Sequence, residues 1–194
     1  MYYYLLAFLF AVLIGALYYM EVFSTRKPAV KILSGFTFVY TEYKSGMSGF
    51  TSNAHKSVKE FFAHNIRFDR HTFCGIFFDD PCKGRKNSLR YAYGIMVDPQ
   101  DVEFIMSKMG PLGYKSIILP STEAAHISYA YRNVFSFYVS SIFWRKINKF
   151  VDELNLGNFM TAGIEVYDTL KNKKIDLYLP IGKEAAQFHF TLQE

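Results

Sequence analysis

The first twenty residues, MYYYLLAFLFAVLIGALYYM, contain no charged side chain. A helix rises about 1.5 Å per residue, so twenty residues span roughly 30 Å, the thickness of the hydrocarbon core of a bilayer. Tyrosines stand at both ends of the segment. Tyrosine favours the membrane–water interface because its ring is apolar and its hydroxyl is hydrated. The pattern predicts one membrane-spanning anchor over residues 1–20.

Two other interpretations of this segment remain open. A cleaved signal peptide, with cleavage after Ser24, is disfavoured because no basic stretch precedes the apolar run. Aromatic residues also occupy the place where small residues would mark a cleavage site. The second alternative is a helix buried in a protein core.

The flanking charges predict the orientation of the anchor. No Lys or Arg precedes it, whereas Arg26, Lys27 and Lys31 follow it closely. Basic flanks stay on the cytosolic side of a membrane, so we expect a lumenal or external N-terminus and a cytosolic domain. The chain has only two cysteines, in agreement with a reducing compartment. Cys74, within the apolar run FCGIFF, is expected to be a buried free thiol, and a bridge to Cys82 is unnecessary.

After a juxtamembrane linker at 21–32, residues 33–194 are expected to form one domain. Hydrophobic residues make up 51% of the chain and aromatics 19%, which is enough for a dense core. The net charge of +5 suits attraction of a tethered domain to anionic lipid head groups. The basic clusters are short and scattered, so direct binding of nucleic acid is not expected.

The periodicity of apolar residues predicts an α+β fold. Strands are expected at 36–43, 72–78, 89–97, 115–119, 123–131, 159–168 and 175–181, and helices at 53–68, 98–109 and 133–156. The order is β-α-β-β, then a helix and a strand, then β-α-β-β again, which is an internal repeat of topology. Two such units predict one antiparallel sheet with both long helices on one face and a concave opposite face.

Several segments resemble GyrI-like domains, the ligand-binding domains of bacterial drug-sensing regulators, which are related to haem-binding SOUL proteins. They are YAYGIMVD at 91–98, GIEVYD at 163–168 and IDLYLPI at 175–181. Together with the anchor, GIFFDDP at 75–81 and the helix VFSFYVSSIFWRKINKFVDELNL at 134–156, they are most similar to the membrane-anchored testis-expressed protein 264 family. The resemblance covers nearly the whole chain.

This resemblance implies a single-pass endoplasmic-reticulum protein with a cytosolic domain and no enzymatic activity. Such a protein would act as a receptor in selective autophagy or quality control, with ubiquitin-like autophagy proteins and an AAA+ unfoldase as partners. In the family the autophagy motif lies in a long tail beyond the domain, and the sequence departs from this pattern because it stops at Glu194, a few residues after the last expected strand. The letters of that motif also occur at Tyr167–Leu170, but Tyr167 falls in an expected strand, so we interpret it as structural.

A candidate ligand site follows from the alternation of side chains along the last two strands. Ala162, Ile164 and Val166 suit the helix-covered face, which leaves Glu165 and Tyr167 on the open concave face. Tyr178 is expected there too, and Tyr93 fits either face. The result would be a cleft lined by these three tyrosines above the Glu165 carboxylate.

A carboxylate among aromatic rings suits a lipophilic cation, because the rings and the negative charge both attract it. Drug-sensing GyrI-like domains use an acidic residue in this way. The alternative is that Glu165 is a solvated strand residue paired with a lysine. No cofactor and no metal site are expected. Since some GyrI-like relatives are hydrolases, a hydrolase that uses Glu165 with a tyrosine is a further alternative.

Overall fold

The computed structural model describes residues 2–19, 21–66, 71–80, 89–132, 136–156, 162–168 and 171–190, without the side chains of residues 47, 48, 137 and 138. The helices are α1 (Tyr2–Tyr19), α2 (Met47–Ala63), α3 (Val102–Met109) and α4 (Ser136–Glu153), with short 3-10 helices η1 (Pro99–Asp101), η2 (Gly110–Leu112) and η3 (Lys183–Phe188). The strands are β1 (Ala29–Leu33), β2 (Phe36–Ser45), β3 (Thr72–Phe77), β4 (Leu89–Val97), β5 (Lys115–Leu119), β6 (Thr122–Ala130), β7 (Gly163–Asp168) and β8 (Lys174–Pro180).

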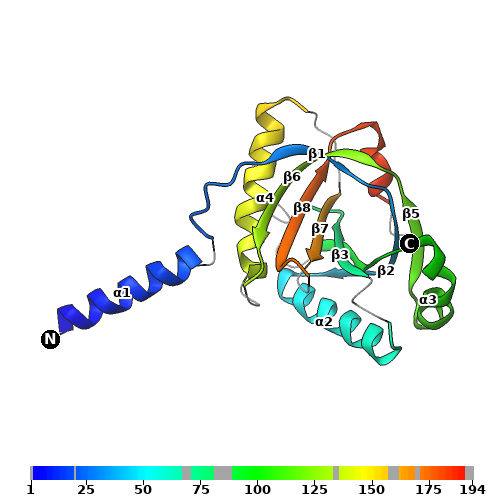
Figure 1. The fold of residues 1–194 in the computed structure, drawn as a ribbon, viewed down its shortest axis with the longest axis horizontal. Coiled ribbons are helices and arrows are strands. Elements are labelled where there is room, and N and C mark those ends of the chain that lie inside the picture. Colours follow the sequence, from blue (N-terminus) through cyan, green and yellow to red (C-terminus); the bar gives the residue numbers. More distant parts are fainter. Residues whose placement is uncertain are drawn as a thin grey trace.

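The eight strands form one antiparallel sheet in the order β1-β6-β8-β7-β3-β4-β2-β5 (Figure 1). The units β2-α2-β3-β4 and β6-α4-β7-β8 are the two expected repeats, and their β3 and β7 strands pair at the centre of the sheet. The α+β fold and the repeated topology are therefore confirmed. The sequence did not predict β1, which begins in the expected linker, ends at the first residue of the expected domain and pairs with β6.

Two apolar layers cover the two faces of the sheet. The helix-face core joins α2 and α4 to one face and includes Phe50, Tyr91, Tyr129, Phe143 and Trp144. The inner core fills the opposite, curled face and includes Phe38, Tyr40, Cys74, Ile76 and Phe188 of η3. Both long helices therefore lie on one face, as expected. Cys74 is a buried free thiol, which is also as expected, while Cys82 lies outside the described residues.

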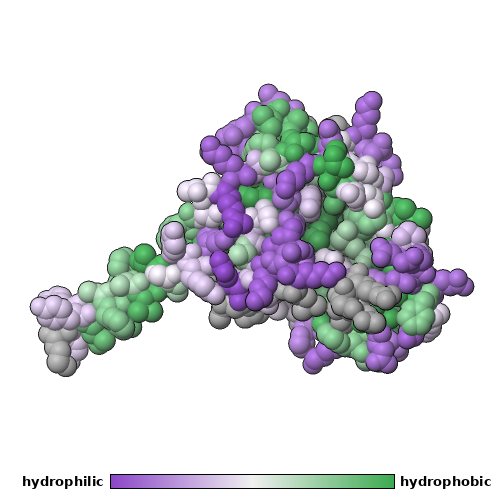
Figure 2. All heavy atoms as spheres, in the orientation of Figure 1, coloured by the Kyte–Doolittle hydropathy of each residue, from purple (hydrophilic) through white to green (hydrophobic). Residues whose placement is uncertain are grey.

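Helix α1 projects from the domain, and its apolar surface is uncovered along its length (Figures 1 and 2). It has no buried residue, which excludes the alternative of a core helix within this chain. In the described part of the chain it is the one helix whose length and composition would allow it to cross a membrane. A signal sequence would meet the same criterion.

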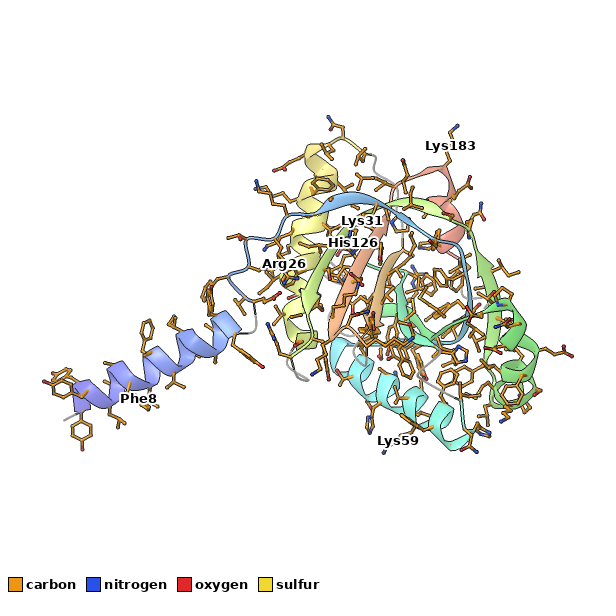
Figure 3. All side chains as sticks on the ribbon, viewed as in Figure 1. Phe8, Arg26, Lys31, Lys59, His126 and Lys183 are labelled. Carbon is orange, nitrogen blue, oxygen red and sulfur yellow. The ribbon has the colours of Figure 1, made fainter. Side chains whose placement is uncertain are left out.

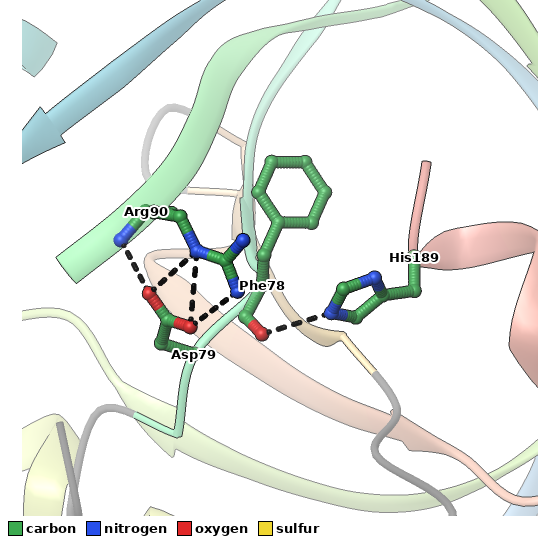
Figure 4. A network of polar contacts seen from close by, with 4 residues as sticks. All are labelled: Phe78, Asp79, Arg90 and His189. Atoms are coloured by element: carbon green, nitrogen blue, oxygen red, sulfur yellow. Dashed lines mark hydrogen bonds and ion pairs between the residues drawn. The ribbon is translucent and has the colours of Figure 1, made fainter. Parts of the chain in front are cut away.

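An ion pair fixes the end of β3 to the start of β4 (Figure 4). The Asp79 carboxylate accepts hydrogen bonds from the backbone N–H of Arg90 at 2.8 Å and from its guanidinium at 2.8 Å. The guanidinium holds the pKa of Asp79 below its usual value. Next to this pair, a ring nitrogen of His189 lies 3.2 Å from the carbonyl oxygen of Phe78. The segment after η3 is therefore tied to the strand that enters the centre of the sheet.

Gly94 of β4 lies at a close approach to the backbone of β2. It pairs with Tyr40 of β2, and a Cβ at this position would lie 1.9 Å from the carbonyl oxygen of Val39. We expect Gly94→Ala to force β2 and β4 apart and to lower the free energy of unfolding by at least about 3 kcal/mol. Urea unfolding of the detergent-solubilised chain measures this change.

Gly110→Ala is the matched control. Its added Cβ would meet only the Met106 side chain, at an ordinary 3.7 Å, and the backbone at Gly110 is already helical. We expect the urea midpoint of the Gly110→Ala protein to stay close to that of the parent chain. Equal urea midpoints for the two variants would contradict the close approach of β2 and β4.

Candidate functional site

Three of the four candidate residues come together beneath the helices. In the sheet, Glu165 of β7 pairs with Gly75 of β3, and Gly75 pairs with Tyr93 of β4. Tyr93 and Tyr167 belong to the helix-face core, and their ring centroids are 5.8 Å apart. Glu165 lies on the same face, because it is bonded to the Trp144 indole of α4.

The prediction that Glu165 and Tyr167 lie on the face of β7 opposite the helices is therefore wrong. Ile164 and Ala162 pack in the inner core, and Glu165 and Tyr167 point toward α4. The alternation of side chains along β7 correctly placed Ile164 and Glu165 on opposite faces, but it did not show which of the two faces packs against the helices. Both faces of the sheet are covered by apolar groups, so an aliphatic set suits either face.

Tyr178 lies on the other side of the sheet. It pairs with Ile164 and His126, packs against the inner core, and its ring centroid is 4.6 Å from that of His126. The buried carboxylate next to it, Asp176, is within 2.9 Å of His126 Nε2 and 2.7 Å of the Lys174 ammonium. Burial raises the pKa of Asp176, but these partners outweigh that effect and hold the pKa at about 2. Tyr178 therefore does not line the same site as Glu165.

The Glu165 carboxylate is only 3% exposed and receives two short hydrogen bonds. The indole Nε1 of Trp144 donates to Oε1 at 2.7 Å, and the hydroxyl of Tyr167 donates to Oε2 at 2.6 Å. These donors are both neutral. The alternative of a solvated strand carboxylate paired with a lysine is thus wrong for Glu165.

Burial raises the pKa of Glu165, although the hydrogen bonds from Tyr167, Trp144 and Ser140 act in the opposite direction. Burial, together with the neighbouring Glu165 carboxyl group, also raises the pKa of the Tyr129 hydroxyl. The Tyr129 hydroxyl is buried and has no hydrogen-bond partner within the described part of the chain. A buried polar atom left without a partner is uncommon and calls for an explanation.

Two glycines make room for this arrangement. Gly75, beside Glu165 in the sheet, has no side chain there, and a Cβ would lie 3.3 Å from the Tyr167 hydroxyl. Gly163 lies beneath Trp144, and a Cβ would come within 2.7 Å of the indole ring. The indole can therefore lie flat enough on the sheet to reach Glu165. A glycine within a strand often marks such a close approach.

The site lies where the two halves of the domain meet. Trp144 covers it from α4, and Phe50 of α2 packs edge-on against Tyr93 with a centroid separation of 6.0 Å. The result is a carboxyl group enclosed by aromatic rings at the centre of the sheet. Sequence reasoning missed Trp144, Gly75, Gly163 and Tyr129. A usable signal was the single tryptophan of the chain, placed within an amphipathic helix.

The raised pKa of Glu165 makes the stability of the fold depend on pH. At pH values between the pKa of Glu165 in the unfolded chain and its higher pKa in the folded chain, the folded state binds more protons than the unfolded state. The contribution of Glu165 to the free energy of unfolding therefore falls as the pH rises through this range. Glu165→Gln removes the titration. We expect the free energy of unfolding of the parent chain, relative to this variant, to be higher near pH 5 than near pH 7.5.

Urea unfolding of both proteins at the two pH values measures this difference. Glu103→Gln, which removes an exposed carboxylate from α3, is the matched control and should give no comparable pH-dependent difference. A difference between parent and Glu165→Gln that stays flat or grows with pH would contradict a raised pKa at Glu165.

No protein-family model and no curated protein sequence matches the chain. Solved structures match in fold. The EcmrR C-terminal domain is 10% identical over 79% of this chain and 96% of that domain, with a TM-score of 0.50. The structure of SAV2435 bound to tetraphenylphosphonium is 12% identical over 85% of this chain and all of that chain, with a TM-score of 0.53. Identities this low establish the fold alone. Membership of the testis-expressed protein 264 family stays a prediction, and the α+β fold is shared with these two structures, consistent with the expected GyrI-like fold.

Proposed function

We propose that this domain binds a lipophilic cation at Glu165 without catalysing a reaction, and that α1 tethers it to a membrane. The observation that carries the proposal is the buried Glu165 carboxylate, which lies between Trp144 and Tyr167 at the centre of the sheet. The bound tetraphenylphosphonium of SAV2435, which shares the fold, supports this class of ligand.

The charge balance of the site favours a cation. A buried carboxylate is costly unless positive charge or several hydrogen bonds compensate it. The donors to Glu165 are an indole, a phenol and the Ser140 hydroxyl, all of them neutral, whereas Asp176 on the opposite face has a lysine ammonium as partner. A lipophilic cation would supply the missing positive charge, and the surrounding rings would add cation–π attraction.

The site must open before such a ligand can bind. Trp144 is 1% exposed and occupies the position above Glu165. A ligand would replace the indole as the partner of the carboxylate, which requires movement of the Trp144 side chain or of α4. The apparent affinity then falls in proportion to the population of the open state. The Tyr129 hydroxyl oxygen can accept a hydrogen bond from the indole N–H once Trp144 is displaced.

Tetraphenylphosphonium is a suitable probe because it is large, apolar and permanently charged. We expect it to bind the detergent-solubilised chain and to raise the thermal unfolding midpoint. Glu165→Gln should weaken binding by at least about tenfold, because it removes the negative charge. Isothermal titration calorimetry measures the affinity, and quenching of the single tryptophan places the ligand near Trp144.

Two controls isolate the charge. Triphenylphosphine oxide, a neutral compound of similar shape, should bind the parent chain weakly and should be insensitive to Glu165→Gln. Glu103→Gln removes an exposed carboxylate and should leave tetraphenylphosphonium affinity unchanged. Equal affinity of the parent and Glu165→Gln proteins for tetraphenylphosphonium would overturn the assignment of Glu165.

The cellular setting of the proposal comes from the apolar helix and from the family resemblance. Endoplasmic-reticulum location, cytosolic orientation, the autophagy-receptor role and the AAA+ partner stay predictions. Tyr167, the aromatic residue of the Tyr167–Leu170 letters, is 5% exposed and bonded to Glu165. An autophagy motif needs an accessible aromatic side chain, so these letters do not support the receptor role. The position of Tyr167 agrees with the structural interpretation made from the sequence.

Microsomes that contain the chain tagged at both ends test the tether. We expect alkaline carbonate to leave the protein in the membrane, because α1 would be embedded in lipid. Added protease should remove the C-terminal tag and leave the N-terminal tag protected. Release of the protein by carbonate would contradict a membrane span. Loss of the N-terminal tag before extraction would indicate a cleaved signal peptide. Protection of the C-terminal tag from protease would contradict the proposed cytosolic orientation of the domain.

A further inference from the structure

The segment that follows α1 is docked onto the domain rather than free of it. The Glu21 carboxylate accepts a hydrogen bond from the Arg26 guanidinium at 2.9 Å and another from the backbone N–H of Ala130 at 3.2 Å. Arg26 also donates to the carbonyl oxygen of Ser128 at 2.8 Å. Val22 packs against the helix-face core. These contacts hold residues 21–26 at the C-terminal end of β6.

Helix α4 provides a second attachment for the same segment. The ammonium group of Lys146 donates to the carbonyl oxygen of Ser24. Together the contacts with β6 and α4 leave few rotatable residues between the apolar helix and the sheet. The end of the domain that contains the C-terminus of β6 is therefore held close to the C-terminal end of α1.

Exposed cations gather at this end. The Arg132 guanidinium lies over the ring of Tyr19, the last residue of α1, at 5.2 Å from its centroid. The carbonyl oxygen of Lys173 accepts a hydrogen bond from Tyr131 N–H at 2.8 Å, so the turn between β7 and β8 lies beside Arg132. Lys171 and Lys173 of that turn are exposed, as are Arg26 and Arg132. We call Arg26, Arg132, Lys171 and Lys173 the basic end of the domain.

Two carboxylates also lie near this end. Glu21 is paired with Arg26, and the Asp168 carboxylate accepts hydrogen bonds from the neutral Asn172 side chain, so the four cations still outnumber the two carboxylates. The exposed aromatic rings of Tyr18, Tyr19 and Phe23 surround the exit of α1. Aromatic rings together with cations are typical of groups that lie at the head-group level of a membrane.

We infer that the basic end contacts anionic lipid head groups of the leaflet into which α1 leads, and that this contact fixes the orientation of the domain on the membrane. The inference rests on the tether proposed above. Basic residues near a bilayer surface are attracted to its negative potential, and the attraction acts only within about a Debye length. The docked segment brings the basic end within that distance, whereas a free linker would let the domain turn away.

The test uses the full chain reconstituted in vesicles of phosphatidylcholine, with or without about one-fifth phosphatidylserine. Hydrogen exchange of the turn at 171–174 is the readout. We expect exchange there to slow at least threefold when phosphatidylserine is present, and the effect to disappear at about 0.5 M salt. The double variant Lys171→Glu/Lys173→Glu should lose the protection.

Lys59→Glu/Lys183→Glu is the matched control, because it makes the same change in charge at two exposed sites that lie away from Arg26 and α1 (Figure 3). It should keep the lipid-dependent protection. Protein that stays in the vesicles but shows no effect of phosphatidylserine, or the same effect in both double variants, would overturn the lipid contact and leave the tether intact. Protein that leaves the vesicles on carbonate washing would overturn the tether and the lipid contact together.

Discussion

The hydrogen bonds to one buried carboxylate link the architecture of this domain to its candidate site. Glu165 is on the central strand of the second repeat, and its two oxygens are satisfied by Trp144 from α4 and by Tyr167 from its own strand. Removing either donor would leave a buried charged group short of partners, which is among the costliest changes in a protein core. The position of α4 on the sheet and the state of the site therefore depend on the same contacts.

The repeated topology places this carboxylate in the middle of the molecule. Because β3 and β7 pair at the centre, the site receives Phe50 from the first half of the domain and Trp144 from the second. The inner core with Phe188 of η3 fills the opposite, curled face. The concave face is thus not the open surface expected from the sequence, and the Glu165 carboxyl group lies under the helices instead.

Much of the fold was predictable because it depends on local patterns. The helical stripes and the alternation of the strands correctly predicted the two repeats and the single antiparallel sheet. The face of β7 was not predictable, since Ile164 and Glu165 alternate equally well in either direction and only tertiary packing decides between them. Strand β1 was missed because its exposed edge lacks a buried pattern and depends on pairing with β6. Trp144 became part of the site because Gly163 leaves room for its indole on the sheet, and this tertiary contact does not follow from the periodicity of the sequence.

The indole N–H of Trp144 gives the most direct view of the central interaction. The chain has a single tryptophan, so a nitrogen-15-labelled sample in micelles gives one indole signal. If the indole donates to the buried Glu165 carboxylate, that signal should exchange slowly with solvent, shift as Glu165 titrates, and lose the pH dependence in Glu165→Gln. An indole that exchanges as fast as free tryptophan and does not respond to pH or to the substitution would contradict the arrangement at the centre of the sheet.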